Sequence, residues 1–138
     1  NGSTQTTATQ LGGHIIGNPN LKNSGSAQAI LNEVISGNPS QLRGYTEVAG
    51  QSARVIVANP YGISCSGCGF INTPRVTLTT GKPAFNSAGG LDHYQVDGGS
   101  VTFDGAGMNA SNVDRFEIIT RSIRLNAVLQ ASNLAIST

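Results

Sequence analysis

The sequence predicts an all-β fold of the parallel β-solenoid type, from its composition, a repeat of proline-centred turns and its short alternating strands. Gly, Ser, Asn and Thr together make up 57 of the 138 residues, and all four types disfavour helix interiors. The net charge of +1 argues against disorder, which usually accompanies a high net charge. The length fits one domain over residues 1–138.

A repeat of Asn-Pro dipeptides marks the turns. These pairs occur at residues 18–19, 38–39 and 59–60, and together with Pro83 they place prolines at spacings of 20, 21 and 23 residues. In each pair the Asn side chain bonds to its own backbone and the Pro presets φ, so each pair initiates a turn. A unit of about 20 residues suits one coil of a parallel β-solenoid. A globular sandwich would also contain many short strands, but the aromatic content of 5% and the short apolar runs favour the solenoid.

Residues 27–35 form the first apolar segment of the strand-and-turn pattern, and two structures fit it. Ile30, Leu31 and Val34 lie at helical spacing, and Ser26 is a suitable helix cap. The same segment also alternates as a strand. We favour the strand because the neighbouring segments are rich in β-forming residues.

Five later segments predict strands. Their apolar and polar residues alternate with a period of two, as Val76 and Leu78 do with Thr77 and Thr79. The segments span residues 54–58, 75–80, 100–103, 115–120 and 122–128. Residues 133–138 have a strand pattern as well, and we therefore expect the chain to be a piece of a longer protein.

The two cysteines, Cys65 and Cys68, are separated by two residues. A zinc site would need further ligands, and since His14 and His93 lie far away in the sequence we expect no metal. A thioredoxin-like motif would need a following helix, which the flanking residues do not predict. If the protein is exported, we favour a local disulfide over a pair of free thiols, with redox catalysis third.

The sequence contains no motif typical of an enzyme, so we expect no catalytic activity, no cofactor and no nucleic-acid partner. No basic stripe is present for nucleic acid, and no apolar run of 18 residues for a membrane-spanning helix. Polysaccharide lyases with a β-helix need clustered carboxylates, often with Ca²⁺ and a basic residue. The charged candidates here are spread along the chain and fit a solvated outer face; they are Asp92, Asp97, Asp104, Asp114, Glu117, Arg115, Arg121 and Arg124. His14 and His93 have no obvious carboxylate partner and are expected at the surface.

Two motifs resemble a known family. Asn18-Pro-Asn-Leu21 and Asn59-Pro-Tyr-Gly-Ile63 begin 41 positions apart. With residues 59–81 as a whole, they resemble the amino-terminal secretion domain, or TPS domain, of two-partner secretion exoproteins (TpsA proteins). These include filamentous haemagglutinins, haemolysins and contact-dependent growth inhibition proteins of Gram-negative bacteria. The family motifs are NPNL and NPNGI, so the first is intact here and the second carries Tyr61 in place of Asn.

The resemblance covers nearly the whole chain and implies both fold and role. The family fold is a right-handed parallel β-helix with short extra-helical strands, and it begins with further strands that we expect this chain to lack. The implied function is secretion targeting of a large exoprotein, such as an adhesin, a haemolysin or a growth inhibition toxin. The chain would be recognised in the periplasm by the POTRA domains of an outer-membrane TpsB barrel, pass through it as a monomer and fold outside, nucleating the β-helix behind it.

Two alternatives to secretion targeting remain at this point. The first is an adhesin module that binds a glycan or a host protein directly, for which the exposed aromatic candidates are Tyr45, Tyr61 and Tyr94. The second, less favoured, is a polysaccharide lyase with a β-helical fold.

Turn chemistry explains the motif residues. The candidate secretion residues are Asn18, Pro19, Asn20, Leu21, Asn59, Pro60, Tyr61, Gly62 and Ile63. Each leading Asn is expected to accept a hydrogen bond from the amide two residues on, and each Pro restricts the unfolded chain at the same corner. Gly62 can take a positive φ. We expect Leu21 and Ile63 to point into the coil and Tyr61 to face solvent, and we favour turn building over direct recognition by the partner.

The family resemblance also bears on the cysteines. Several family members carry two cysteines at the place of Cys65 and Cys68. A bridge across two residues is compatible with passage through a barrel, whereas a long-range disulfide would block it. Its stabilisation is expected to be modest because the closed loop is short.

Overall fold

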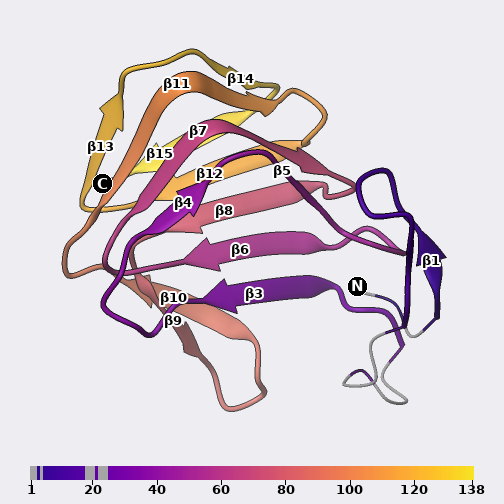
Figure 1. Ribbon diagram of the computed structural model, residues 1–138. Helices are drawn as coiled ribbons and strands as arrows, with labels where there is room; N and C mark the ends of the chain where they lie inside the picture. The colour runs from indigo at the N-terminus through magenta and orange to yellow at the C-terminus, as the bar shows by residue number, and fades with distance from the viewer. Residues whose placement is uncertain (1–2, 4, 18–20, 22–24) are drawn as a thin grey trace.

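The computed structural model describes residues 3, 5–17, 21 and 25–138, which wind into a parallel β-helix (Figure 1). Every strand pairing between successive coils is parallel. The described residues contain no α-helix, and hence no helix long and apolar enough to cross a membrane. The predicted fold class is therefore confirmed.

The first sheet takes one strand from each of five coils. In spatial order these are β3 (Ala29–Glu33), β6 (Arg54–Ala58), β8 (Arg75–Thr79), β12 (Arg115–Ile119) and β15 (Leu134–Ser137). The ambiguous segment 27–35 is thus a strand, as favoured. Val55 pairs with Val76, a separation of 21 residues that equals one proline spacing.

The second sheet is built on two long strands, β7 (Ile63–Ile71) and β11 (Ser100–Ala110), which pair with each other. Two short strands, β4 (Ser40–Leu42) and β5 (Tyr45–Glu47), pair with the two halves of β7. On the other side β13 (Ser122–Leu125) and β14 (Leu129–Ala131) pair with the two halves of β11. The predicted strand 122–128 is therefore a strand only over Ser122–Leu125, because residues 126–128 turn the corner that precedes β14, where β7 and β11 bend as well (Figure 1).

Two antiparallel hairpins account for the extra-helical strands. β1 (Thr7–Ala8) pairs with β2 (His14–Ile15), and β9 (Lys82–Phe85) pairs with β10 (Leu91–Gln95). Pro83 lies within β9, so the last proline spacing does not mark a coil corner. Because the second hairpin is inserted into one coil, Arg75 pairs with Arg115, 40 positions later.

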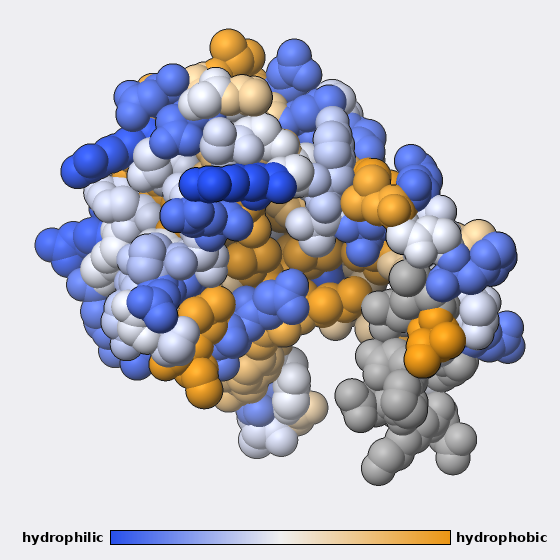
Figure 2. Space-filling model, in the orientation of Figure 1, coloured by the Kyte–Doolittle hydropathy of each residue, from blue (hydrophilic) through white to orange (hydrophobic). Residues whose placement is uncertain are grey.

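The hydrophobic core fills the space between the two sheets. Alternate residues of each strand point inward and stack in rows from coil to coil; the largest fully buried ones include Phe70, Phe103, Phe116, Ile63, Leu78 and Ile118. The rings of Phe70 and Phe116 are 5.7 Å apart. Each such side chain contributes about 1.5–3 kcal/mol to stability by burial. The face seen in Figure 2 is mostly hydrophilic, with apolar surface gathered over β3 and β6.

Candidate functional site

The second motif forms the corner between β6 and β7, and Asn59 holds this corner together. The side chain of Asn59 is fully buried. Its Oδ1 accepts a hydrogen bond from the backbone N–H of Tyr61 at 2.9 Å, which is the predicted bond to the amide two residues on. Its Nδ2 donates to the carbonyl oxygen of Asn38 at 2.9 Å and to Oγ of Ser40 at 2.8 Å. The oxygen and both protons of the amide therefore have partners inside the protein.

Gly62 closes the same corner. Its φ is 122°, in the region predicted for it, and its N–H donates to the carbonyl oxygen of Asn59 at 3.1 Å. A Cβ at this position would lie 3.3 Å from the carbonyl oxygen of Ser100, which is tighter than an ordinary contact. Both the backbone conformation and the available space therefore favour glycine.

The next side chains on either side of Gly62 point in opposite directions, as predicted. Ile63 is 2% exposed and belongs to the core, whereas Tyr61 is 52% exposed. Tyr61 is thus the side chain of this corner that the folded protein presents to solvent. An aromatic residue is accommodated there because a side chain that faces solvent does not have to fit into the core.

The corner belongs to a column of corners that stack from coil to coil. A Cβ on Gly62 would lie 3.6 Å from Cβ of Pro39 in the preceding coil. In the following coil, a Cβ on Gly99 would lie 2.7 Å from the carbonyl oxygen of Pro60. The column continues with Ser100, whose Oγ is 2.6 Å from Oγ of Ser122. A change at one corner therefore affects its neighbours above and below.

Most of the first motif, Asn18, Pro19 and Asn20, lies outside the described residues, so its predicted turn stays a prediction. Leu21 is described and is half-buried. The corner that contacts Asn59 is the Asn-Pro pair at residues 38–39, which lies between the two motifs in the sequence. The repeat in the sequence indicated this corner, but no sequence signal identified Ser40 as the second partner of Asn59.

Cys65 and Cys68 form a disulfide at the bend of β7. Their Cα atoms are 5.5 Å apart, and both residues are buried. Between them Gly67 has a φ of 68°, which lets the chain turn within the bridge. The favoured local disulfide is confirmed, and the alternative of free thiols is wrong.

Comparison with known families identifies this arrangement. A family model described as the TPS secretion domain matches residues 6–138. The chain belongs to the TPS secretion domain family. Among solved structures, the TPS domain is similar to the crystal structure of the filamentous hemagglutinin secretion domain, with a TM-score of 0.78 and 39% sequence identity over 89% of this chain and 40% of that chain.

Curated relatives of this TPS domain are much longer proteins. It is 56% identical to a tRNA nuclease CdiA of Escherichia coli (strain STEC_O31) over 94% of this chain, and 54% identical to a 16S rRNA endonuclease CdiA of Enterobacter cloacae over 99%. The chain spans only 4% of the length of either relative. Exoproteins with this TPS domain are secreted through the periplasm to the cell surface or extracellular space of Gram-negative bacteria. The nuclease names describe those whole proteins.

One carboxylate of the TPS domain departs from expectation. Glu117 is 8% exposed, so its predicted place on a solvated outer face is wrong. Its carboxylate accepts a hydrogen bond from Nε of Arg75 and lies 3.3 Å from Nε of Arg115. Burial raises the pKa of Glu117, but the bond from Arg75 and the charges of both arginines outweigh burial and hold this pKa below its usual range. The hydrogen bond with Glu117 in turn raises the pKa of Arg75.

The other charged candidates lie at the surface of the TPS domain, as predicted; they are Asp92, Asp97, Asp104, Asp114, Arg115, Arg121 and Arg124. His14 is also exposed. Nδ1 of His93 is 2.8 Å from Oδ2 of Asp92, so the expectation that His93 has no carboxylate partner is wrong. Both side chains of that pair are 60% exposed, which fits a surface contact. Within the described part of the chain, no three His, Cys, Asp or Glu side chains gather into a potential metal site.

Proposed function

We propose that this TPS domain targets a larger exoprotein for secretion and that the periplasmic POTRA domains of a TpsB outer-membrane barrel bind it before it folds. The proposed secretion residues are Asn18, Pro19, Asn20, Leu21, Asn59, Pro60, Tyr61, Gly62 and Ile63. The observation that carries the proposal is the complete burial of Asn59 together with its three internal hydrogen bonds.

A partner cannot reach Asn59 in the folded domain without breaking those bonds. Ile63 is equally inaccessible, and among residues 59–63 only Tyr61 offers a large exposed surface. Direct contact with the buried side chains of the motif therefore requires the unfolded chain. The disulfide is consistent with this order, since it closes only a short loop and leaves a chain that can be threaded in an extended form.

The motif itself acts chiefly in folding. Asn59 joins its own corner to that of the preceding coil, and each of these hydrogen bonds contributes about 0.5–1.5 kcal/mol. Closing one coil on the next is the step that creates the two parallel sheets. The corner therefore stabilises the first coils once the chain has reached the outside of the cell.

The last described coil supports a nucleating role. Three of its inward-facing residues lie in register with fully buried residues of the coil below, yet they are 51%, 39% and 43% exposed; they are Leu125, Leu134 and Ile136. The curated relatives are far longer than this domain, which spans 4% of the relatives named above. We infer that further coils of the exoprotein cover this apolar row and continue the parallel sheets.

The proposed role is non-catalytic and needs neither metal nor cofactor. Glu117, the most buried carboxylate of the described residues, is engaged by Arg75 and Arg115 and is not free to act as an acid or base. A single TPS domain passing through the barrel requires no second copy, so we propose a monomer.

Binding to the POTRA domains of the cognate TpsB barrel tests the proposal. Wild-type and Asn59→Ala chains, held unfolded in urea at a concentration that leaves the POTRA domains folded, are compared with the folded domain as competitor. Asn86→Ala, which alters an exposed Asn in the β9–β10 hairpin, is the control. We expect all three unfolded chains to bind alike and the folded domain to compete poorly.

Two results would count against the proposal. Equal competition by the folded domain would overturn recognition before folding. Weaker binding by unfolded Asn59→Ala alone would show that the partner reads Asn59 directly, and would overturn the folding role of the motif. Secretion in cells completes the test, because Asn59→Ala is expected to lower the amount of folded domain outside the cell while Asn86→Ala leaves it unchanged.

A further inference from the structure

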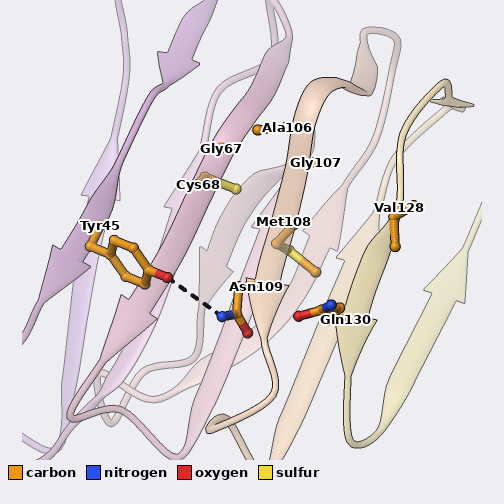
Figure 3. Close-up of a pocket in the computed structure, with 9 residues that line it drawn as sticks. All are labelled: Tyr45, Gly67, Cys68, Ala106, Gly107, Met108, Asn109, Val128 and Gln130. Carbon is orange, nitrogen blue, oxygen red and sulfur yellow. Dashed lines mark hydrogen bonds between the residues drawn. The ribbon is translucent and has the colours of Figure 1, made fainter.

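The ring of Tyr45 lies flat on the outer face of the second sheet. Tyr45 of β5 is paired with Gly69 of β7, and a Cβ added to Gly69 would lie only 2.2 Å from Cε1 and 2.5 Å from Cδ1 of the ring. One face of the ring is therefore covered by the Gly69 backbone, while the residue as a whole remains 50% exposed. Figure 3 shows the ring with its hydroxyl directed toward Asn109. The opposite face of the ring is thus presented to solvent by a rigid support.

Two side-chain amides continue the row that begins with Tyr45. Asn109 of β11 pairs with Gly69, and Gln130 of β14 pairs with Asn109. Oδ1 of Asn109 accepts hydrogen bonds from the backbone N–H and the hydroxyl of Ser111 at 3.2 and 2.7 Å, and its Nδ2 lies 3.5 Å from the hydroxyl of Tyr45. Gln130 is exposed, and its amide lies on the side toward Asn109 (Figure 3). Since neighbouring strands lie about 4.8 Å apart, the row from Gly69 to Gln130 is about 10 Å long.

An irregularity of the sheet hollows the surface beside this row. The pairing of β7 with β11 jumps across the bend, so that the single residue Gly67 faces the three residues 105–107. Gly107 has a φ of 72° and lies against the backbone of Val128, a residue that is 72% exposed. The result is a groove of about 250 Å³ between Tyr45 and Val128. β-Bulges in general are over-represented next to active sites, where they redirect side chains.

We propose that this groove binds a neutral saccharide, an activity that does not depend on the proposed secretion role. None of the residues that line the groove is charged, so a charged ligand would find no counter-ion there. The second Nδ2 proton of Asn109, the amide of Gln130 and the hydroxyl of Tyr45 offer donors and acceptors side by side, which suits the hydroxyl groups of a sugar. The exposed face of Tyr45 suits the apolar face of a sugar ring.

The groove between Tyr45 and Val128 is unsuited to binding a peptide as an added β-strand. β7 and β11 are interior strands of the second sheet, with neighbours on both sides, so outside the bend their backbone groups are already paired. Neither of the other candidate tyrosines has an equivalent setting. Tyr61 lies at the column of corners, and the hydroxyl of half-buried Tyr94 accepts a hydrogen bond from Nη2 of Arg54.

Nuclear magnetic resonance of the ¹⁵N-labelled 138-residue chain tests the site with three neutral probes: maltotriose, cellotetraose and tri-N-acetylchitotriose. We expect at least one of them, at millimolar concentration, to shift the side-chain amide signals of Asn109 and Gln130 and the backbone signal of Gly67. Tyr45→Ala is expected to weaken that binding at least tenfold, equivalent to about 1.4 kcal/mol. Tyr61→Ala, which removes a tyrosine of similar exposure at the column of corners, is the matched control and is expected to bind as wild type.

A second variant keeps the test independent of folding. Tyr45→Ala uncovers Gly69 and can lower stability, whereas Gln130→Ala removes only an exposed side chain and is expected to weaken binding severalfold in a folded protein. No shift with any of the three sugars would overturn the site, and so would unchanged binding by Gln130→Ala or equal loss in Tyr61→Ala. Secretion of Gln130→Ala is expected to equal that of wild type, so failure of the saccharide site and failure of the secretion role are separable.

Discussion

The side-chain amide of Asn59 donates a hydrogen bond to the backbone carbonyl oxygen of Asn38, 21 positions earlier, at 2.9 Å. This bond joins two Asn-Pro corners of successive coils. The repeat that is visible in the sequence is therefore also a physical connection along the axis of the β-helix. It explains why a secretion motif of this family begins with a residue that the folded domain hides from any partner.

Asn59→Ala is expected to lower the free energy of unfolding by about 2–4 kcal/mol, because it removes three hydrogen bonds and leaves the carbonyl of Asn38, the hydroxyl of Ser40 and the amide of Tyr61 without this partner. Urea unfolding followed by circular dichroism measures the change. Asn86→Ala removes an Asn whose Oδ1 accepts two backbone N–H bonds in an exposed hairpin, and we expect a loss below about 1 kcal/mol there. Equal losses in the two variants would contradict the role of Asn59.

Gly62→Ala is expected to destabilise the domain by about 1–3 kcal/mol, since alanine is strained at a φ of 122° and its Cβ would press on the carbonyl oxygen of Ser100. Gly37→Ala provides the control, because Gly37 does not have a positive φ and a Cβ there meets nothing within 4 Å. That variant is expected to stay within about 0.5 kcal/mol of wild type. The shift in thermal midpoint distinguishes the two, and a Gly62→Ala protein as stable as Gly37→Ala would refute the argument.

The ion pairs of Glu117 predict a pH dependence of stability. The folded-state pKa of Glu117 is lowered, so its contribution is fully present above the unfolded pKa of about 4.3 and disappears as the pH falls through the lower folded value. Glu117→Gln is therefore expected to be less stable than wild type by about 1–2 kcal/mol at neutral pH, and the difference should vanish in strong acid. Unfolding free energies measured across this range test the sign.

Glu33→Gln is the matched control for that series, because Glu33 is exposed on β3. Its stability is expected to follow wild type at every pH. A Glu117→Gln deficit that persisted unchanged in acid would mean that shape, and not charge, accounts for the effect.

Removal of the disulfide in Cys65→Ala/Cys68→Ala is expected to lower the free energy of unfolding by about 2 kcal/mol, because the bridge closes a loop of only four residues. Secretion through the TpsB barrel should continue, since the bridge is local. Reductant should weaken the wild type and leave the double variant unchanged, which separates the bond from the packing of its sulfur atoms. Loss of folding in the double variant would show that the bridge does more than constrain a short loop.

Local chemistry explains how much of this domain could be predicted from its residues. The hydrogen bond that Asn59 accepts from the amide of Tyr61, the positive φ of Gly62 and the burial of Ile63 all lie within five consecutive residues. Their geometry depends on the neighbouring backbone and little else. The strand segments are predictable for the same reason, because alternation of apolar and polar side chains is also a local property.

The features that the sequence did not reveal depend on the register between coils. Ser40 meets Asn59 across 19 positions, which is about one coil. Arg75 meets Glu117 across 42, because the inserted β9–β10 hairpin lengthens that coil. The placement of the Tyr45 ring over Gly69 follows from the same alignment of strands. The sequence by itself determined the coil, its period and the chemistry of its corners. Only the tertiary structure decided which side chains meet across the coils, because coil lengths differ and parallel pairing aligns residues that no fixed spacing relates.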